Sequence, residues 1–273
     1  MMSLQLASQL KSELFSRYSL VPSEQWLNEF LSNSRNPSHP LPALTSTAHF
    51  RLLSTDFTTT LSTRQGKVLP AKVSDVHTKE LILQIDIPVQ VLDIQDTSTS
   101  KWSQIEAIER VERGEEIRGR EVIRNVPGIN DDDDADGGDQ GQVTGSSSRP
   151  SATSSTNASG NSKKGSTGPH KVLLQDAAGT KAWAFETSRI ERITIVNSNP
   201  PVPGATATQT VVEGMQIGCK FVLRRGTKVR RGLIMMTPAN TTVMGGKVEA
   251  WDKKWREGRK ARLHQELERE NSG

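Results

Sequence analysis

A long stretch in the middle of the chain cannot contribute to a folded core. Asn130–Pro169 is rich in aspartate, glycine, serine and threonine and has almost no apolar side chains. Such a composition buries too little apolar surface to offset the conformational entropy lost on ordering. We therefore predict that residues 130–169 are disordered and that the folded structure comes from the residues on either side of them.

The chain as a whole has the composition of a soluble intracellular protein with a modest core. Only 33% of its 273 residues are hydrophobic and the mean hydropathy is −0.54. There is no apolar run of the roughly 18 residues that cross a bilayer, and the N-terminus lacks the features of a signal peptide. A single cysteine, Cys219, excludes an internal disulfide and a cysteine-cluster zinc site, and its strand context predicts a small core residue.

The charge of the chain is unevenly distributed. Between Ile129 and Gly168, six aspartates face three cations, which gives this segment a charge of −3. The whole chain carries +4, so the remaining residues carry +7. A folded part this basic is compatible with a polyanionic partner, although it does not require one.

Residues 1–66 have the pattern of a three-helix bundle. Apolar residues recur at helical spacing over residues 3–18, and Pro22 begins a second helix that carries Trp26. A proline-rich linker follows, and a third helix is predicted from about Ser46. Its apolar side consists of Phe50, Leu53, Phe57 and Leu61. We expect Trp26 to lie in the core of this bundle rather than to act as a ligand platform.

Residues 67–273 have the pattern of a small β-barrel interrupted by an insertion at residues 96–169. Alternating apolar residues predict a strand over 81–94 that bends, bulges or lies at an edge at Pro88. A hairpin follows around the turn Asp176–Gly179, with Val172, Leu174, Trp183 and Phe185 pointing inward. A strand signal at 188–195 is followed by a loop, a second hairpin around Gly226-Thr227, a last strand, and a C-terminal helix over Lys247–Glu270.

Together these features predict an α+β fold, in which an N-terminal three-helix bundle precedes a small OB-type barrel with a long disordered insertion and a C-terminal helix. An SH3-like barrel has a similar number of strands and is the structural alternative. Before the disordered tract, residues 104–111 predict a short helix.

No enzymatic constellation is found in the sequence. Its five histidines are dispersed, and no HExxH, phosphate-loop, dinucleotide or nucleophile-elbow motif occurs. The aspartates of the central tract lie among glycine and serine, which is typical of a solvated charge run rather than of a cation site. We therefore expect a protein that is not an enzyme and that has no cofactor, metal or small-molecule substrate.

The second hairpin is strongly basic and carries no compensating acid of its own. Its cations are Lys220, Arg224, Arg225, Lys228, Arg230 and Arg231. Barrels that bind single strands combine such cations with exposed aromatic side chains, but this hairpin offers only Phe221. Three interpretations therefore remain: a solvated hairpin tip, a weak contact with DNA, or a docking edge for a protein.

Three stretches together resemble one known family. They are Pro22-Ser-Glu-Gln-Trp26-Leu27 in the helical part, Leu173–Gly179 in the barrel, and the run from Gly232 through Pro238, Asn240 and Gly245-Gly246 to Val248. This pattern resembles the RecQ-mediated genome instability (Rmi) family, the OB-fold subunit of the RecQ helicase–topoisomerase III complex, in its shorter fungal form. The resemblance spans nearly the whole chain outside the central tract.

The resemblance implies a non-catalytic scaffold in the nucleus that binds topoisomerase III and works with a RecQ-family helicase in DNA repair, recombination and replication. In that family an insertion between the first two barrel strands reaches into the topoisomerase gate, and the complex dissolves double Holliday junctions. Residues 96–169 occupy the matching place, with Trp102, Ile105 and Ile108 as the candidate partner contacts. The alternative is a free-standing single-strand nucleic-acid-binding protein.

Overall fold

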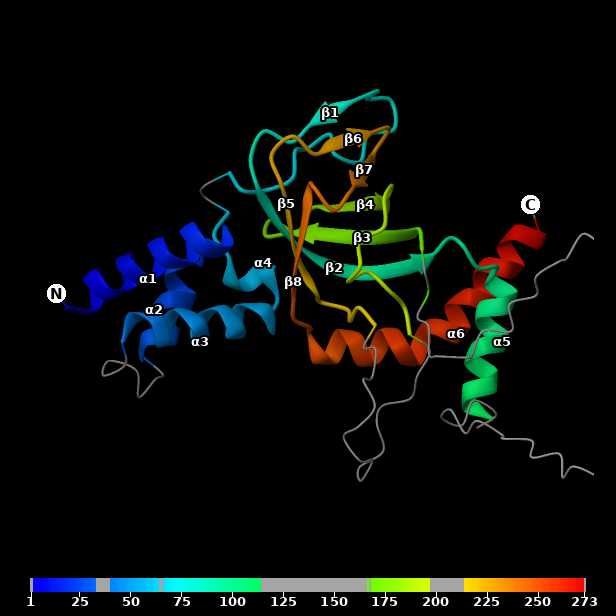
Figure 1. Ribbon diagram of the computed structural model, residues 1–273, viewed down its shortest axis with the longest axis horizontal. Coiled ribbons are helices and arrows are strands. Elements are labelled where there is room, and N and C mark those ends of the chain that lie inside the picture. Colours follow the sequence, from blue (N-terminus) through cyan, green and yellow to red (C-terminus); the bar gives the residue numbers. More distant parts are fainter. Residues whose placement is uncertain are drawn as a thin grey trace, which may run out of the picture.

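The computed structural model describes residues 2–32, 40–63, 66–113, 166, 168–196 and 214–272. A helical part lies on one side of a β-barrel, and helix α5 (Lys101–Glu112) lies on the other side, next to the end of the C-terminal helix α6 (Glu249–Asn271) (Figure 1). The predicted α+β architecture is thus confirmed. The central tract predicted to be disordered lies outside the described residues, apart from Ser166, Gly168 and Pro169.

The described residues of the N-terminal part form four helices rather than three. They are α1 (Met2–Tyr18), α2 (Glu24–Ser32), α3 (Leu41–Leu53) and the single turn α4 (Phe57–Thr60). Helix α3 begins directly after Pro40, earlier than predicted. Pro42 is tolerated in its first turn, because the N–H groups of a first turn have no partner within the helix and the N–H that proline lacks is therefore not needed. Asp56 separates α4 by capping it, as its side chain accepts a hydrogen bond from the N–H of Thr58 (2.8 Å).

The core of the helical part differs from the prediction at Phe50. This side chain is 73% exposed, whereas Leu44, Ala48 and Leu52 form the buried face of α3 at the regular spacing of four residues. The prediction placed Phe50 and Phe57 on the apolar side of one helix. In the structure Phe57 is fully buried, but it belongs to α4, whose axis is independent of α3.

Trp26 lies at the margin of this core rather than at its centre. Its ring stacks on Phe30 at a centroid distance of 5.2 Å, and the side chain is only partly buried. Complete removal of a buried aromatic ring costs about 3–5 kcal/mol. We therefore expect Trp26→Ala to lower the free energy of unfolding by a smaller amount, about 2 kcal/mol, measured by urea denaturation. A change below about 0.5 kcal/mol, the size typical of surface substitutions, would show that the ring contributes nothing to the bundle.

The strands form one sheet that rolls into a partly open barrel. They are β1 (Leu81–Ile82), β2 (Ile87–Asp96), β3 (His170–Asp176), β4 (Lys181–Glu186), β5 (Lys220–Leu223), β6 (Lys228–Arg230), β7 (Leu233–Met236) and β8 (Thr241–Gly245). Their order is β1-β6-β7-β4-β3-β2-β5-β8, with β4 and β7 parallel and the other neighbours antiparallel. Strands β5 and β6 lie near opposite edges of this order, yet only residues 224–227 join them.

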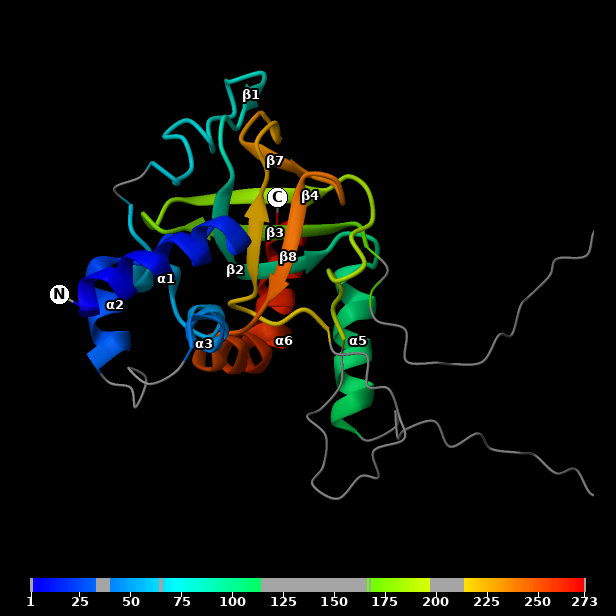
Figure 2. The same cartoon turned by 60° about the vertical axis from the view of Figure 1, so that its left-hand side comes forward.

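A link of four residues spans at most roughly 14 Å, so the two edges of the sheet must approach each other. The connection from β7 to β8 imposes the same closure. Figures 1 and 2 both show β5 and β8 crossing β2, β3 and β4, as two walls of a barrel do. The predicted hairpin of β5 with β6 is therefore wrong: β5 pairs with β2 and β8, and β6 pairs with β1 and β7.

The strand predicted over residues 81–94 is divided in two. Strand β1 pairs only with β6, and β2 starts again at Ile87. Between them the Asp86 carboxylate accepts a hydrogen bond from the N–H of Arg225 (2.8 Å), which anchors the turn after β5. Pro88 lies where β2 pairs only with β5, since the pairing of β2 with β3 begins at Val89. The pairing of β2 with β3 therefore loses no hydrogen bond through the N–H that Pro88 lacks.

The inward residues of β4 are the opposite of those predicted. Ala182, Ala184 and Glu186 are buried, whereas Trp183 and Phe185 are only partly buried and point outward. The hairpin register pairs Leu173 with Trp183, so both lie on the outer face. The prediction required a register shifted by one residue, which exchanges the two faces of a strand. Small alanines on the inner face leave room for the larger side chains of the barrel core.

The barrel core is a single cluster to which all the longer strands contribute. It includes Val89, Val91, Val172, Leu174, Phe221, Leu223, Ile234 and Met236. Cys219 belongs to it, as predicted, and burial raises the pKa of its thiol to about 11. The predicted strand at 188–195 forms no ladder, although Ile190, Ile193 and Ile195 are buried in this core. Helix α6, close to its predicted bounds, packs Trp251 and Trp255 against the same cluster.

The helical part is joined to the barrel by tight contacts. Gly246 has φ = +83°, and a Cβ atom at this position would lie 2.4 Å from the carbonyl oxygen of Leu53. Gln90 of β2 completes the junction, since its Oε1 accepts a hydrogen bond from the N–H of Phe57 (2.9 Å) and its Nε2 donates to Asp56 (2.7 Å). The Gly-Gly pair in the sequence is therefore explained by close backbone packing.

Candidate partner and nucleic-acid interface

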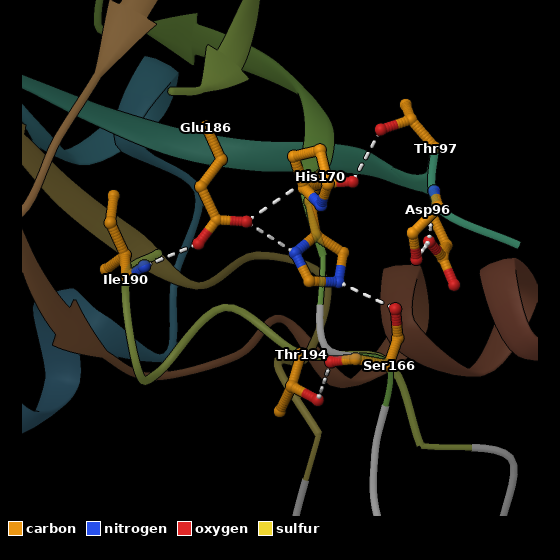
Figure 3. A network of polar contacts seen from close by, with 9 residues as sticks. Asp96, Thr97, Ser166, His170, Glu186, Ile190 and Thr194 are labelled. Atoms are coloured by element: carbon orange, nitrogen blue, oxygen red, sulfur yellow. Dashed lines mark hydrogen bonds and ion pairs between the residues drawn. The ribbon is translucent and has the colours of Figure 1, made fainter. Parts of the chain in front are cut away.

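The insertion leaves and re-enters the barrel between the end of β2 and the start of β3. Figure 3 shows the polar network that holds its two ends together. The carbonyl oxygen of Pro169 accepts hydrogen bonds from the N–H (3.1 Å) and the hydroxyl (2.6 Å) of Thr97. Asp96 accepts further hydrogen bonds from the backbone and side chain of Ser98. The two strands are thus tied at the point where the insertion begins.

A buried pair, His170 and Glu186, lies beneath this anchor. His170 is 0% exposed, and its Nδ1 lies 2.7 Å from Glu186 Oε2, which also accepts the N–H of His170 (3.0 Å). The other carboxylate oxygen accepts the N–H of Ile190. Burial disfavours the charged carboxylate, but the hydrogen bonds from His170 and Ile190 outweigh it and lower the pKa of Glu186. The pair therefore holds a charged group rigidly under the base of the insertion.

The anchor also fixes the ends of the second segment outside the described residues, 197–213. His170 Nε2 lies 3.0 Å from the hydroxyl of Ser166, whose N–H donates to the carbonyl oxygen of Ile195 (2.9 Å). Thr194 donates from its hydroxyl to Ser166 (3.0 Å) and accepts from the N–H of Met215 (2.7 Å). Residues 166, 196 and 214 therefore lie at one end of the barrel.

Helix α5 forms the first part of the insertion and packs along α6. Its charged face is matched to that helix: Lys101 pairs with Glu266 and Glu270, and Lys260 pairs with Glu109 and Glu112. Arg259 of α6 donates a buried hydrogen bond to Gln104 of α5 (3.1 Å), and burial lowers its pKa to about 10. These contacts make α5 and α6 one rigid platform beside the root of the insertion.

The three predicted partner contacts on α5 have different environments. Trp102 is 66% exposed and therefore available to a partner. Ile105 is 3% exposed, so the expectation that it contacts a partner is wrong: it lies on the buried face of α5, next to the buried Gln104. Ile108 is partly buried, one turn further along the helix. The structure thus leaves Trp102 as the exposed anchor among the three.

The basic residues around β6 do have compensating acids, which come from residues 79–86 rather than from the strands themselves. Arg224 pairs with Asp86 (2.9 Å), while Lys228 and Arg230 share Glu80 at 3.6 Å and 2.9 Å. These contacts lower the pKa of Glu80, first through the hydrogen bond from Arg230. Arg225 and Arg231 are exposed, and no partner of their side chains is found in the part of the chain that the structure describes.

Lys220 does not belong to this surface. It is 0% exposed and lies at the junction with the helical part, where its Nζ donates to Gln90 Oε1 (2.8 Å) and lies 4.5 Å from the centre of the Phe57 ring. Burial lowers its pKa to about 7. The prediction of a nucleic-acid contact at Lys220 is therefore wrong, because β5 pairs on both sides and its side chains are buried.

Two features of this region were missed by the sequence reasoning. The His170–Glu186 pair gives no local signal, because its members belong to different strands and have no spacing motif. The outward position of Trp183 could have been found from the length of the turn. When Gln175 pairs with Lys181, each even-numbered residue of β3 pairs with an even-numbered residue of β4. This register places Ala182 and Ala184 on the same face as the inward residue Leu174.

Neither a metal-binding cluster nor a membrane-spanning helix is found among the described residues. Within these ranges, no group of three or more His, Cys, Asp or Glu is placed to hold a metal ion. The helices of the described ranges also include none with the length and apolar character that crossing a membrane requires.

Comparison with known proteins agrees with this architecture. A family model described as the RMI1 N-terminal OB-fold domain matches residues 69–205 and 206–259, and one described as the RMI1 N-terminal helical domain matches residues 14–60. The chain is also similar to RecQ-mediated genome instability protein 1 of Schizosaccharomyces pombe, with 25% identity over 194 residues that cover 70% of this chain and 68% of the relative. The matched regions are the two parts seen in the fold, and this chain therefore belongs to the RMI1 family.

Proposed function

We propose that the protein is a non-catalytic subunit that docks on topoisomerase III in a complex with a RecQ-family helicase, where it promotes the dissolution of double Holliday junctions in the nucleus. Membership of the family supports this role. The observation that carries it is the rigid root of the insertion, where Thr97, Pro169 and the His170–Glu186 pair join the two ends. A segment that must enter a gate in a partner needs a fixed base of this kind.

The exposed Trp102 supports the same proposal. It lies on α5, which α6 holds in place through ion pairs and the buried Arg259–Gln104 hydrogen bond. A large, exposed aromatic side chain on a rigid element is typical of an interface hot spot, because little conformational entropy is lost when it binds. The acidic and serine-rich part of the insertion follows α5 in the sequence, so a partner that binds Trp102 would lie beside the start of this part.

The experiment is capture of purified topoisomerase III by three forms of the full chain: the parent, a variant with residues 114–165 replaced by a short Gly/Ser linker, and Trp102→Ala. We expect both variants to bind at least tenfold more weakly, as a hot-spot residue contributes about 2 kcal/mol or more. The linker variant should melt within about 2 °C of the parent, because most of its removed residues have the polar composition that buries little apolar surface and because loop length affects stability only weakly.

The matched control is Phe50→Ala, an aromatic side chain of similar exposure on the opposite side of the molecule, in α3. This variant should capture topoisomerase III as the parent does. If the linker variant and Trp102→Ala also bind like the parent, the insertion is not the docking element and the proposal fails. A melting temperature that falls by many degrees in the linker variant would instead show that the removed residues pack on the barrel.

A further inference from the structure

A shallow groove lies between helix α6, which runs along the base of the barrel, and strand β2 (Figure 1). We call it the α6 groove; its lining combines apolar side chains with two cations and consists of Leu92, Ile217, Trp251, Lys254, Trp255 and Arg262. Its volume is about 220 Å³. Pockets for small molecules usually measure roughly 300–1,000 Å³, so this groove suits one apolar side chain of a partner better than a whole small ligand.

Two irregularities of the chain shape the α6 groove. Leu92 is the extra residue of a β-bulge, because β3 pairs with Val91 and Asp93 but not with Leu92. Bulges turn a side chain out of the regular alternation and are frequent beside functional sites. Gly258 lies within α6, where glycine destabilises a helix relative to alanine. A Cβ atom at Gly258 would lie 2.9 Å from Nη1 of Arg262, so the glycine leaves room for that guanidinium beside the helix.

The lining of the α6 groove is held in place by the protein itself. Trp251 and Trp255 pack against the barrel core, and the indole N–H of Trp255 donates to the carboxylate of Asp93 (2.5 Å). The guanidinium groups of Arg259 and Arg262 lie over the Trp255 ring, 5.4 Å and 5.6 Å from its centre. Arg262 also donates a hydrogen bond to the carbonyl oxygen of Trp255 (2.8 Å). A lining that is ordered in this way lowers the entropic cost of binding a partner.

The two cations of the groove belong to a strongly basic stretch of α6. Residues 253–262 contain six cations and one carboxylate, which gives a charge of +5. Other cations of this stretch pair with carboxylates of α5 and α6. Lys254 and Arg262 have no carboxylate partner in the part of the chain that the structure describes, and no acidic residue lines the groove. The negative charge that matches them must therefore come from a partner.

We propose that the α6 groove binds an acidic segment of a partner protein. One apolar side chain of this segment enters the groove beside the two tryptophans, and carboxylates on either side of it pair with Lys254 and Arg262. Hydrogen bonds between such cations and carboxylates are of the strong, charge-assisted type. A nucleic acid is the less suitable occupant, because its bases need an open aromatic face on which to stack, whereas two guanidinium groups already lie over the Trp255 ring.

The test selects ligands for the immobilised full chain from a phage-displayed library of short random peptides. We expect the selected peptides to share acidic residues on both sides of one bulky apolar residue. The peptide that is enriched most is then labelled with fluorescein, and its binding to the full chain is measured by anisotropy. Lys254→Glu should bind this peptide about tenfold more weakly than the parent, because repulsion between carboxylates replaces a charge-assisted hydrogen bond.

Gly258→Ala separates the position of the guanidinium from the stability of the helix. Alanine favours a helix more than glycine does, but its Cβ atom displaces the guanidinium of Arg262. This variant should therefore unfold at no lower urea concentration than the parent and yet bind the peptide several-fold more weakly. The matched control is Lys253→Glu, which reverses an exposed lysine next to Lys254 that does not line the groove. It should bind the peptide with nearly the parental affinity.

Three results would overturn the proposal. The first is that no peptide is enriched on the parent over Lys254→Glu, or that the enriched peptides lack carboxylates. The second is that Lys253→Glu weakens binding as much as Lys254→Glu does, which would indicate a general effect of charge rather than a site. The third is displacement of the peptide by a single-stranded oligonucleotide, which would assign the groove to nucleic acid. The inference does not depend on the proposed function, because these variants retain Trp102 and residues 114–165, and either can fail alone.

Discussion

Replacing Glu186 with alanine is expected to lower the free energy of unfolding by about 3–5 kcal/mol, because three donors lose their only strong acceptor at about 1–3 kcal/mol each. These donors are the backbone N–H of His170, its ring, and the N–H of Ile190, all buried. A loss of this size is a large part of the total stability of an ordinary domain. It would be measured by urea denaturation at neutral pH.

The pH dependence tests the electrostatic part of this prediction. The folded state lowers the pKa of Glu186, so the carboxylate contributes stability above the ordinary pKa of glutamate, and this contribution is lost as the pH falls through the lower folded value. The difference in stability between the parent and Glu186→Gln should therefore be greatest at neutral pH and should narrow in acid.

The control for Glu186 is Glu80→Ala, which removes an exposed carboxylate that pairs with Lys228 and Arg230 and should change stability far less than Glu186→Ala does, because solvent screens exposed ion pairs. A variant of Glu186 that melts like the parent would show that the base of the insertion is held by Thr97 and Pro169 alone. It would also remove the physical argument for a rigid root, since the buried pair would then contribute nothing to it.

The elements of this fold were predictable where the sequence pattern is local. The bounds of α1 and α6, and the hairpin of β3 with β4, follow from hydrophobic periodicity and from turn residues, and the structure confirms them to within two residues. The presence of α5 was also predicted, but this helix begins at Lys101, after its cap Ser100, rather than at residue 104. Phe50 was assigned to the wrong face because the pattern was continued across Asp56, where a capping residue starts a new helix with its own axis. Periodicity is informative only within one element.

Pairing between distant strands was not predictable in the same way. The strand-like runs on either side of Gly226-Thr227 predicted a hairpin, yet barrel closure assigns β5 and β6 to different neighbours. The acids that compensate these cations, Glu80 and Asp86, are more than 130 residues away in the sequence. The prediction of the candidate site failed at two residues for the same reason. The buried position of Lys220 and the outward position of Trp183 both depend on the register between strands, which no local sequence signal specifies.

Lys220→Met is expected to stabilise the protein by about 2–4 kcal/mol at pH 6, because a buried ammonium is replaced by an apolar side chain of similar length. Burial lowers the pKa of Lys220 to about 7, whereas the nearby Asp56 raises it only in part. The substitution leaves no unsatisfied acceptor, since Gln90 Oε1 still accepts the N–H of Phe57. The methionine can also pack against the ring that the ammonium now contacts.

The sign of the pH dependence follows from linkage. Because the folded pKa of Lys220 is lower than its unfolded value, protonated Lys220 destabilises the folded state below about pH 7, and this cost disappears as the pH rises from about 7 towards the ordinary pKa of lysine. The advantage of Lys220→Met should thus be greatest at pH 6 and close to zero by about pH 10, with urea denaturation at each pH as the measurement. Lys181→Met, at an exposed position on β4, should show no such trend. If Lys220→Met is less stable than the parent throughout this range, Asp56 and Phe57 stabilise the buried ammonium. Lys220 would then strengthen the contact between the helical part and the barrel instead of destabilising the fold.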